Sequence, residues 1–233
     1  VEVTEVRPGD MAAFAELYEE WRPELLIVIG DRHDMFPAAL AALPFRIPVA
    51  HISGGEVTEG AIDDALRHSM TKLSHLHFVS TDIYRDRILQ MGEEPHRVVI
   101  SGSLAIDAMI NTELMSTVEL KKTFEFDAGE PFILATFHPV TLEADQTETH
   151  IRNLLSVVET IGSESGMSTV FTAPNPDTSS DLILSAIQRF TSESHFTRLI
   201  LNAGSRGYFS LMNEAEVMMG NSSSGIAEAP SFG

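Results

Sequence analysis

One segment of the sequence, from His51 to His68, concentrates side chains that could transfer protons. An apolar run ends there at a Ser-Gly-Gly turn, and apolar residues recur at helical spacing from about Ala61, so the segment reads as strand, turn and helix. Glu56 lies in the connection, and Asp63 lies in the first helical turn. Parallel α/β sheets bind ligands at the carboxyl ends of their strands, so both carboxylates are candidates for general acid or base catalysis.

The segment from Gly220 to Pro230 has the residue types of a diphosphate site. An apolar strand ends at Met219, and three serines and a glycine then lead into a helix that carries Glu228. Serine hydroxyls and free backbone amides would converge there on one point, which suits a diphosphate. A capped helix after a Gly/Ser loop has the same pattern, and without context both interpretations stand. The segment lacks the Gly-Lys-Ser/Thr ending of a Walker loop.

Several other polar residues directly follow predicted strands. His138 could donate to a phosphate or move a proton, and its alternative is a histidine satisfied by nearby backbone. Asp31 and Arg32 also fit a capping residue with a solvated neighbour, and Asn175, between two prolines, fits a turn. Each ordinary interpretation is reasonable alone. The accumulation of such residues at one end of successive strands favours a single ligand-binding crevice.

The helix that begins near Ala61 carries two pairs of opposite charge at a spacing of four residues, Asp63 with Arg67 and Asp64 with His68. Taken singly, each pair predicts an ordinary ion pair on the helix surface. No set of His, Asp and Glu has the spacing of a metal site, so no metal is predicted. Five histidines do not directly follow a predicted strand, and we predict structural roles for them. They are His75, His77, His96, His150 and His195.

Strand and helix patterns alternate along the chain in two series, which a polar stretch over residues 111–130 separates. Uninterrupted apolar strands predict sheets that are covered on both faces, and the alternation predicts parallel strands. We therefore predict an α/β fold with two Rossmann-like, doubly wound parallel-sheet lobes, residues 1–112 and 113–233, both incomplete. The predicted strands cover residues 25–29, 47–52, 76–80, 97–100, 132–136, 169–172, 197–201 and 216–219.

Composition narrows the classes of partner. A net charge of −19, from 15 Lys and Arg against 34 Asp and Glu, makes nucleic acid and anionic membranes poor partners. The absence of cysteine excludes disulfides and thiol catalysis and fits a cytoplasmic protein. No apolar run approaches the roughly 20 residues of a membrane span. The sequence starts in mid-pattern without Met, so we expect an interior part of a larger protein.

Five segments, in order along the chain, resemble the hydrolysing UDP-N-acetylglucosamine 2-epimerases of sialic-acid-type nonulosonate synthesis. They are Gly30–Asp34, His51–His68, Thr71–Phe78, Thr136–Thr141 and Gly220–Gly233. The resemblance implies a glycosyltransferase B-type architecture in which the C-terminal lobe holds UDP and the N-terminal lobe faces the sugar. It implies a reaction in which loss of the C2 proton and anti elimination of UDP give a 2-acetamidoglycal. Hydration of this glycal with inversion at C2 then releases ManNAc.

The resemblance also implies roles for single residues, while the proposed elimination requires no cofactor. Catalytic positions match Asp31, Asp63 and His138. Positions that contact the nucleotide, its diphosphate or its ribose match Arg32, Asn175, Ser222, Ser223 and Glu228. A divalent cation could accompany the diphosphate, and we expect a homo-oligomer.

The chain departs from the family pattern at Ser53, where well-studied members carry Glu before the Gly-Gly pair. Glu56 could take over part of the role of that Glu, or the C2 base could be Asp31 or Asp63. The substitution could also accompany a different sugar, such as the UDP-2,4-diacetamido-trideoxyglucose of the legionaminic acid pathway.

Three further functions stay open at this stage. A non-hydrolysing epimerase would keep its product linked to UDP, although the Gly-Gly-Glu turn argues against that branch. A nucleotide-sugar-binding module without catalysis is the alternative outside enzymes, and Ser53 gives it some support. A glycosyltransferase would share the fold alone, which does not fix the function.

Overall fold

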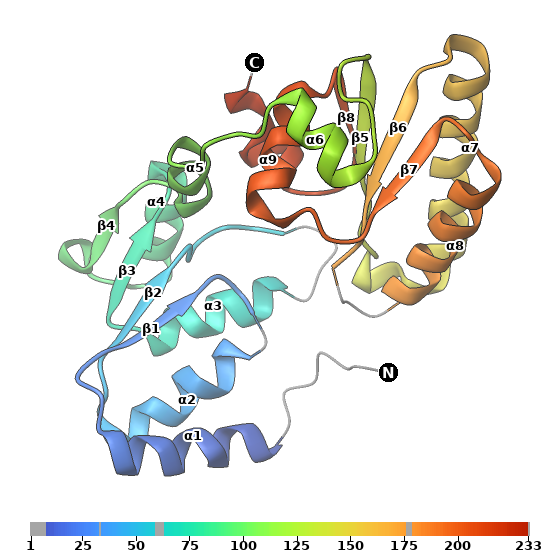
Figure 1. The fold of residues 1–233 in the computed structure, drawn as a ribbon. Coiled ribbons are helices and arrows are strands. Elements are labelled where there is room, and N and C mark those ends of the chain that lie inside the picture. The colour runs from blue at the N-terminus through green and yellow to red at the C-terminus, as the bar shows by residue number, and fades with distance from the viewer. Residues whose placement is uncertain (1–7, 33, 59–62, 176–178, 233) are drawn as a thin grey trace. The chain divides into compact units, whose positions relative to one another are not determined.

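The computed structural model describes residues 8–32, 34–58, 63–175 and 179–232. The chain divides into two compact units, Val1–Ser103 and Leu104–Gly233, and each contains a four-stranded parallel sheet (Figure 1). The predicted α/β class with two parallel-sheet units is confirmed. The division falls after Ser103, whereas the sequence analysis placed a lobe boundary after Thr112. Within the described residues, no helix is long and apolar enough to cross a membrane.

In the first unit, the strands lie side by side in chain order, β1-β2-β3-β4. A row across the sheet joins Val28, His51, His77 and Val98, and all four side chains are buried. The core beneath it combines the alanine-rich face of α2 with Val49 and Met70 and other apolar residues. Its elements are α1 Pro8–Trp21, β1 Leu26–Ile29, α2 Met35–Phe45, β2 Val49–Ile52, α3 Asp63–Leu73, β3 Leu76–Val79, α4 Asp82–Gln90 and β4 Val98–Ile100.

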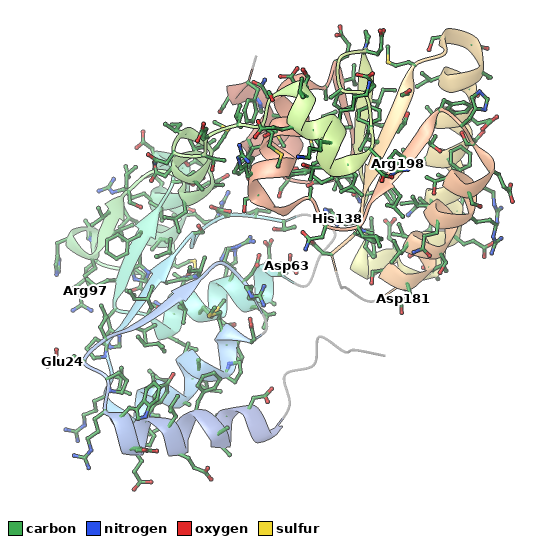
Figure 2. All side chains as sticks on the ribbon, in the orientation of Figure 1. Glu24, Asp63, Arg97, His138, Asp181 and Arg198 are labelled. Carbon is green, nitrogen blue, oxygen red and sulfur yellow. The ribbon has the colours of Figure 1, made fainter. Side chains whose placement is uncertain are left out.

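In the second unit, the strand order is β7-β6-β5-β8, so the direction of winding reverses at β5. Parallel sheets of this kind bind ligands where the order reverses, which here is the carboxyl end of β5 and β8. His138 follows β5 and is labelled in Figure 2. The strands are β5 Phe132–Thr136, β6 Ser168–Thr172, β7 Thr197–Ile200 and β8 Val217–Gly220.

Helices cover both faces of the second sheet (Figure 1). Leu134 and Val170 pack in one hydrophobic core with residues of α6 and α9, whereas their neighbours Ala135 and Phe171 pack in another with residues of α7 and α8. Alternate residues therefore serve opposite cores, which explains why the strands are apolar throughout. The helices are α5 Leu104–Ile110, α6 Thr117–Phe124, α7 Thr147–Ser165, α8 Ser180–Glu193, α9 Gly204–Glu214 and α10 Ser224–Ala227.

The region between the two series of elements contains two short helices, α5 and α6. The polar stretch 111–130 contains only a short helix, α6, whose first turn is fixed by a capping box between Ser116 and Glu119. The helix ends at Phe124, and Glu125 after it adopts a left-handed conformation with φ 53°. The pattern did not predict α5, because seven residues are too few for a helical period to stand out from a short apolar run.

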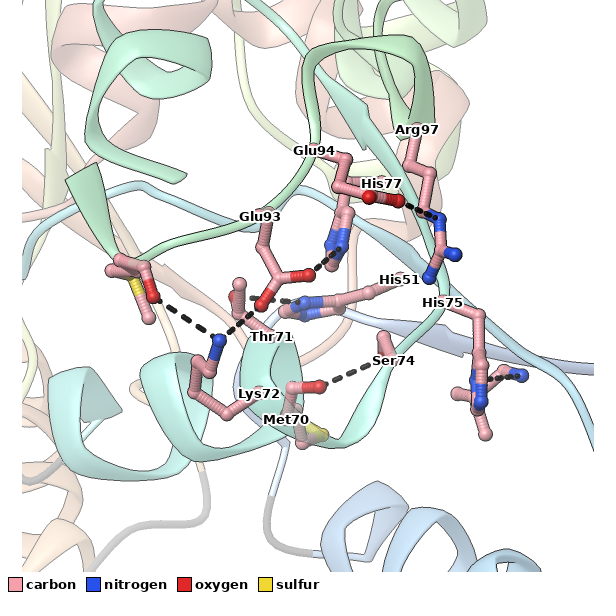
Figure 3. A network of polar contacts seen from close by, with 12 residues as sticks. His51, Met70, Thr71, Lys72, Ser74, His75, His77, Glu93, Glu94 and Arg97 are labelled. Atoms are coloured by element: carbon pink, nitrogen blue, oxygen red, sulfur yellow. Dashed lines mark hydrogen bonds and ion pairs between the residues drawn. The ribbon is translucent and has the colours of Figure 1, made fainter. Parts of the chain in front are cut away.

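Two buried histidines lie on neighbouring strands of the first unit, His51 on β2 and His77 on β3 (Figure 3). Burial lowers the pKa of His51 to about 4. Burial also lowers the pKa of His77, although Glu93 opposes this at 3.3 Å between Nε2 and Oε2. Lys72 pairs with the same carboxylate, and although burial of Glu93 opposes the effect, the two partners together lower the pKa of Glu93. His51 is therefore neutral at neutral pH.

Because His51 is buried with a lowered pKa, we predict that the free energy of unfolding falls as the pH is lowered from about 6.5 towards about 4. In this window the unfolded chain protonates at His51, whereas the folded chain, with its pKa near 4, does not. The unfolded state then binds more protons, so stability rises with pH by about 1.4 kcal/mol per pH unit for such a site. Urea unfolding at a series of pH values would measure this slope.

The matched variants for this measurement are His51→Gln and His96→Gln. His51→Gln removes the titrating group, so its slope should be shallower by about one proton. His96 is exposed, so His96→Gln should keep the slope of the parent protein. An unchanged slope in His51→Gln would show that the acid sensitivity comes from other groups.

Candidate functional site

The first group of candidate residues, within the first unit, surrounds the turn that follows β1. His51 Nε2 lies 2.7 Å from the carbonyl oxygen of Gly30, to which it must donate because a carbonyl only accepts. His51 Nδ1 lies 3.2 Å from the hydroxyl of Thr71 on α3. Gly30 itself adopts a left-handed conformation with φ 64°. The imidazole thus fixes the backbone directly before Asp31.

The Gly-Gly pair after β2 is required by its surroundings. A Cβ at Gly54 would lie 2.9 Å from His51 Nδ1, and one at Gly55 would lie 2.5 Å from the carbonyl oxygen of Tyr84. Gly55 also has φ 78°, which side chains with a Cβ rarely adopt. Ser53, where the family pattern has Glu, has φ 62°. The turn therefore passes closely between His51 and α4, and this path places Glu56.

Arg67 lies in the centre of this first group and is buried, with 5% of its side chain exposed. Its guanidinium pairs with the carboxylate of Asp31, lies 3.3 Å from Asp64 and donates to the Thr58 hydroxyl at 3.0 Å. The surface position predicted for Arg67 is therefore wrong, because α3 turns this side chain towards the strand ends. A guanidinium without water needs acidic partners, and the turn after β1 supplies one of them.

Besides Asp31, the first group contains the carboxylate of Glu56, which is half-buried. Burial raises the pKa of Glu56 and Asp31 adds to the effect, against the charge of Arg67 and a 3.4 Å hydrogen bond from Ser80. Ser80 follows β3, so the carboxyl ends of three successive strands meet here. A carboxyl group with a raised pKa is better suited to accept a proton from carbon than one paired with arginine.

Two other residues that the sequence predicted for the site belong to the same unit. Asp63 is the first residue of α3. Arg32 is exposed and forms a two-pronged ion pair with Asp34, with its Nε 3.0 Å and its Nη2 2.8 Å from the two carboxylate oxygens. In this arrangement the Arg32 side chain is turned to Asp34 rather than to Asp31.

A second group of candidate residues, within the second unit, lies at the carboxyl ends of β5 and β8. The Asn221 side chain accepts from the backbone NH of His138 at 2.7 Å and donates to the His138 carbonyl at 2.9 Å. His138 Nδ1 accepts from the backbone NH of Asn175 at 3.1 Å. Neutral His138 therefore carries its proton on Nε2. The structure thus brings His138 and Asn175 together, as the sequence predicted, and adds Asn221, for which no role was predicted.

Serines and a half-buried carboxylate also belong to the second group. The Ser222 hydroxyl lies 2.7 Å from that of Ser224, and Ser223 is exposed. Burial raises the pKa of Glu228, and its Oε2 atom has no hydrogen-bond partner among the described residues. A buried carboxylate oxygen without a donor suits a ligand hydroxyl. Gly220, with φ 137°, lies so close to the Thr136 carbonyl that only glycine fits.

Metal ligation is not among the functions that these groups suggest. In the parts of the chain that the structure describes, no three His, Cys, Asp or Glu side chains form a group that could hold a metal ion. The polar groups are arranged instead as carboxylates in one unit and hydroxyl, amide and imidazole groups in the other. Hydroxyl, amide and imidazole groups can donate hydrogen bonds to phosphate oxygens.

Two parallel-sheet units with polar residues at their strand ends define a Rossmann-like α/β protein of the kind that binds nucleotides. The model of the UDP-N-acetylglucosamine 2-epimerase family matches residues 8–233, and the chain belongs to this family. The resemblance seen in the sequence is thus confirmed.

Curated relatives and solved structures agree with this assignment. The chain is 41% identical to a GDP/UDP-N,N'-diacetylbacillosamine 2-epimerase (hydrolyzing) of Campylobacter jejuni, over 95% of the chain and 57% of the relative. It is 30% identical to the UDP-N,N'-diacetylbacillosamine 2-epimerase (hydrolyzing) of Legionella pneumophila, over 96% of the chain and 58% of the relative. The chain therefore spans little more than half the length of these relatives.

A solved structure shares the fold. The UDP-GlcNAc 2-epimerase from Neisseria meningitidis, bound to UDP-GlcNAc, matches with a TM-score of 0.81 at 24% identity. The match covers 96% of this chain and 61% of the Neisseria chain.

Proposed function

We propose that this chain belongs to a hydrolysing 2-epimerase that acts on a UDP-linked 2-acetamido sugar. The observation that carries the proposal is its 41% identity, over 95% of the chain, to a relative named as a hydrolysing epimerase. The carboxylates of the first unit and the hydroxyl and imidazole groups of the second support the same chemistry. The sequence favoured UDP-GlcNAc as substrate, whereas the names of both curated relatives favour UDP-N,N'-diacetylbacillosamine.

In the proposed reaction, Glu56 accepts the C2 proton of the sugar. The C2–H electron pair forms the C1–C2 double bond, and the C1–O bond breaks with its electron pair leaving on UDP. Glu56 suits this role because its pKa is raised by burial, so its conjugate base is stronger than an ordinary carboxylate. Arg67 compensates Asp31 next to it, which keeps two carboxylates in one small region.

Hydration of the glycal completes the reaction. Water adds its oxygen to C1 and gives up one proton to Asp31, and C2 receives a proton on the face opposite to the one that lost it. Inversion therefore needs a second acid besides Glu56, and Asp63 at the start of α3 is the candidate. Asp31 is proposed to orient the water.

The diphosphate is proposed to lie at the carboxyl ends of β5 and β8. His138 would donate from Nε2 to a phosphate oxygen, where charge grows as UDP leaves. Asn175, Ser222 and Ser223 would contact the nucleotide and its diphosphate. Glu228 would accept from the ribose hydroxyls. Arg32 would contact the nucleotide after exchange of its Asp34 partner.

Elimination and hydration involve no net oxidation or reduction, so no organic cofactor is proposed. A divalent cation could accompany the diphosphate in solution. The proposal also includes a cytoplasmic location, in keeping with a chain without cysteine, and a homo-oligomeric state.

Proton NMR of UDP-GlcNAc and of UDP-N,N'-diacetylbacillosamine with the full-length protein in deuterium oxide tests the function. We expect release of UDP and a free sugar with inverted C2 that carries deuterium, and the faster sugar identifies the substrate. A C2-exchanged product still linked to UDP would show a non-hydrolysing epimerase. Binding of UDP with both spectra unchanged would show a module without this catalysis.

A further inference from the structure

A chain of hydroxyl groups runs through the second unit towards the serine segment. Thr172 and Thr136 hydroxyls lie 2.6 Å apart, and Thr136 lies 3.4 Å from the Tyr208 hydroxyl. Tyr208 lies 2.6 Å from Ser224, which lies 2.7 Å from Ser222. This series of hydroxyl groups thus links the ends of β5 and β6 to helix α9 and to the residues that follow β8.

The five hydroxyl groups have one proton more than the contacts between them require. Five hydroxyl groups carry five protons, and four contacts between them use four. If every link is made, one hydroxyl keeps a proton that no other hydroxyl accepts. It can be any of the five, because a hydroxyl inside the series can accept from both of its neighbours. Thr172 is 8% exposed, and no acceptor for its proton lies outside the chain of hydroxyls among the described residues. Thr136 and Ser224 are buried as well, and a buried donor without an acceptor is costly, so none of these three threonine and serine hydroxyls keeps the proton. Of the two partly buried hydroxyls, Tyr208 can donate across its short contact with Ser224, so the links run outward and the unused proton lies on Ser222.

The chemistry of Tyr208 favours the same direction. A phenolic hydroxyl is a stronger hydrogen-bond donor than an aliphatic one, and its shortest contact is with Ser224. Successive hydrogen bonds in one direction polarise each other, so the terminal hydroxyl becomes a better donor. Ser222 is only partly buried, so its hydroxyl can reach a ligand. The backbone NH of Ser224 also points to the Ser222 oxygen, at 3.4 Å, which leaves the Ser222 proton for an outside acceptor.

We infer that Tyr208 is a positioning residue that, through Ser224, orients the Ser222 hydroxyl to donate to an anionic oxygen of a bound nucleoside diphosphate. The inference rests on the proposed function in one respect, the diphosphate as the ligand of Ser222. Tyr208 itself contacts no ligand in this account. Its effect on binding passes entirely through Ser222.

A double-mutant cycle on the full-length protein tests this role. Calorimetric titration with UDP would compare Tyr208→Phe, Ser222→Ala and the double variant with the parent protein. Tyr208→Phe should weaken UDP binding about threefold to tenfold, and Ser222→Ala by at least as much. The double variant should bind no more weakly than Ser222→Ala alone, because Tyr208 acts only through the hydroxyl that is already missing. Binding of uridine, measured by ligand-observed NMR, should not change in Tyr208→Phe.

A matched control lies on the same helix. Ser205 is exposed on α9, and Ser205→Ala should bind UDP like the parent protein. If Tyr208→Phe does not fold, Ser224→Ala interrupts the same link and should give the same lack of additivity with Ser222→Ala.

The outcomes separate the inference from the proposed function. A parent protein that binds no UDP contradicts the proposed function, and the inference falls with it. If the parent binds UDP and Tyr208→Phe binds equally well, the inference alone is overturned. Losses that add in the double variant, or an equal loss of uridine binding, would show that Tyr208 only supports the local structure, which also overturns it.

Discussion

Glu56→Gln is expected to lower the kcat of the full-length enzyme by about 100-fold to 10,000-fold, with little change in KM. The amide keeps the size of the side chain but cannot accept the C2 proton. The half-buried carboxyl group contacts Ser80 at 3.4 Å and has no arginine hydrogen bond among its described contacts, so its removal should leave the Arg67 cluster intact. Steady-state kinetics of UDP release would measure the effect.

The pH profile gives a second readout for the same variant. Burial raises the pKa of Glu56, and the group must be deprotonated to act as a base. Activity of the parent enzyme should therefore fall as the pH drops through this raised pKa, and the residual activity of Glu56→Gln should lack that acid limb.

The matched control is Glu94→Gln, because Glu94 is an exposed carboxylate of the same unit. It should retain the parent activity. If Glu56→Gln keeps more than about a tenth of the parent kcat, Glu56 is not the C2 base, and Asp31 and Asp63 become the candidates.

Gly220→Ala is expected to destabilise the protein by about 3 kcal/mol or more. Its φ of 137° is a conformation that side chains with a Cβ rarely adopt, and a Cβ would overlap the carbonyl oxygen of Thr136. Backbone strain contributes about 1–3 kcal/mol, and forced displacement of neighbouring backbone contributes a similar amount. Because β5 and β8 pair through these residues, relief of the overlap would separate the strands next to the serine segment.

Urea unfolding would measure this loss, with Gly225→Ala as the control from the same segment. A Cβ at Gly225 would meet only the Met218 sulfur, at 3.7 Å, which is an ordinary contact. Gly225→Ala should therefore change the free energy of unfolding by less than about 1 kcal/mol. Equal losses in the two variants would show that the segment is sensitive to any side chain rather than to this overlap.

The sequence predicted those parts of the fold that depend on local patterns. All eight strands lie where apolar runs predicted them, within two residues at each end, because a buried parallel strand leaves an uninterrupted apolar run. Helix ends follow less directly from local patterns: α2 continues past Pro44 to Phe45, although proline usually ends a helix.

The site was predictable to the extent that its residues directly follow strands. His138 and Asn175 were found in this way, and the structure brings them into contact. Arg67 was taken for a surface residue, because helical spacing does not tell which face of a charged helix turns inward. Tyr208 and Asn221 were missed because their contacts join residues that lie 72 and 83 positions apart in the chain.

The buried His51 ring has a mechanical consequence for the first unit. Its two nitrogen atoms contact the turn after β1 on one side and helix α3 on the other, at 2.7 and 3.2 Å. A five-membered ring is rigid, so it acts as a spacer of fixed length between these two segments. Asp31 follows one contact and Asp63 begins the helix that carries the other. The two carboxylates are therefore parts of one rigid body, and fluctuations of the surrounding loops should displace them together rather than change their separation.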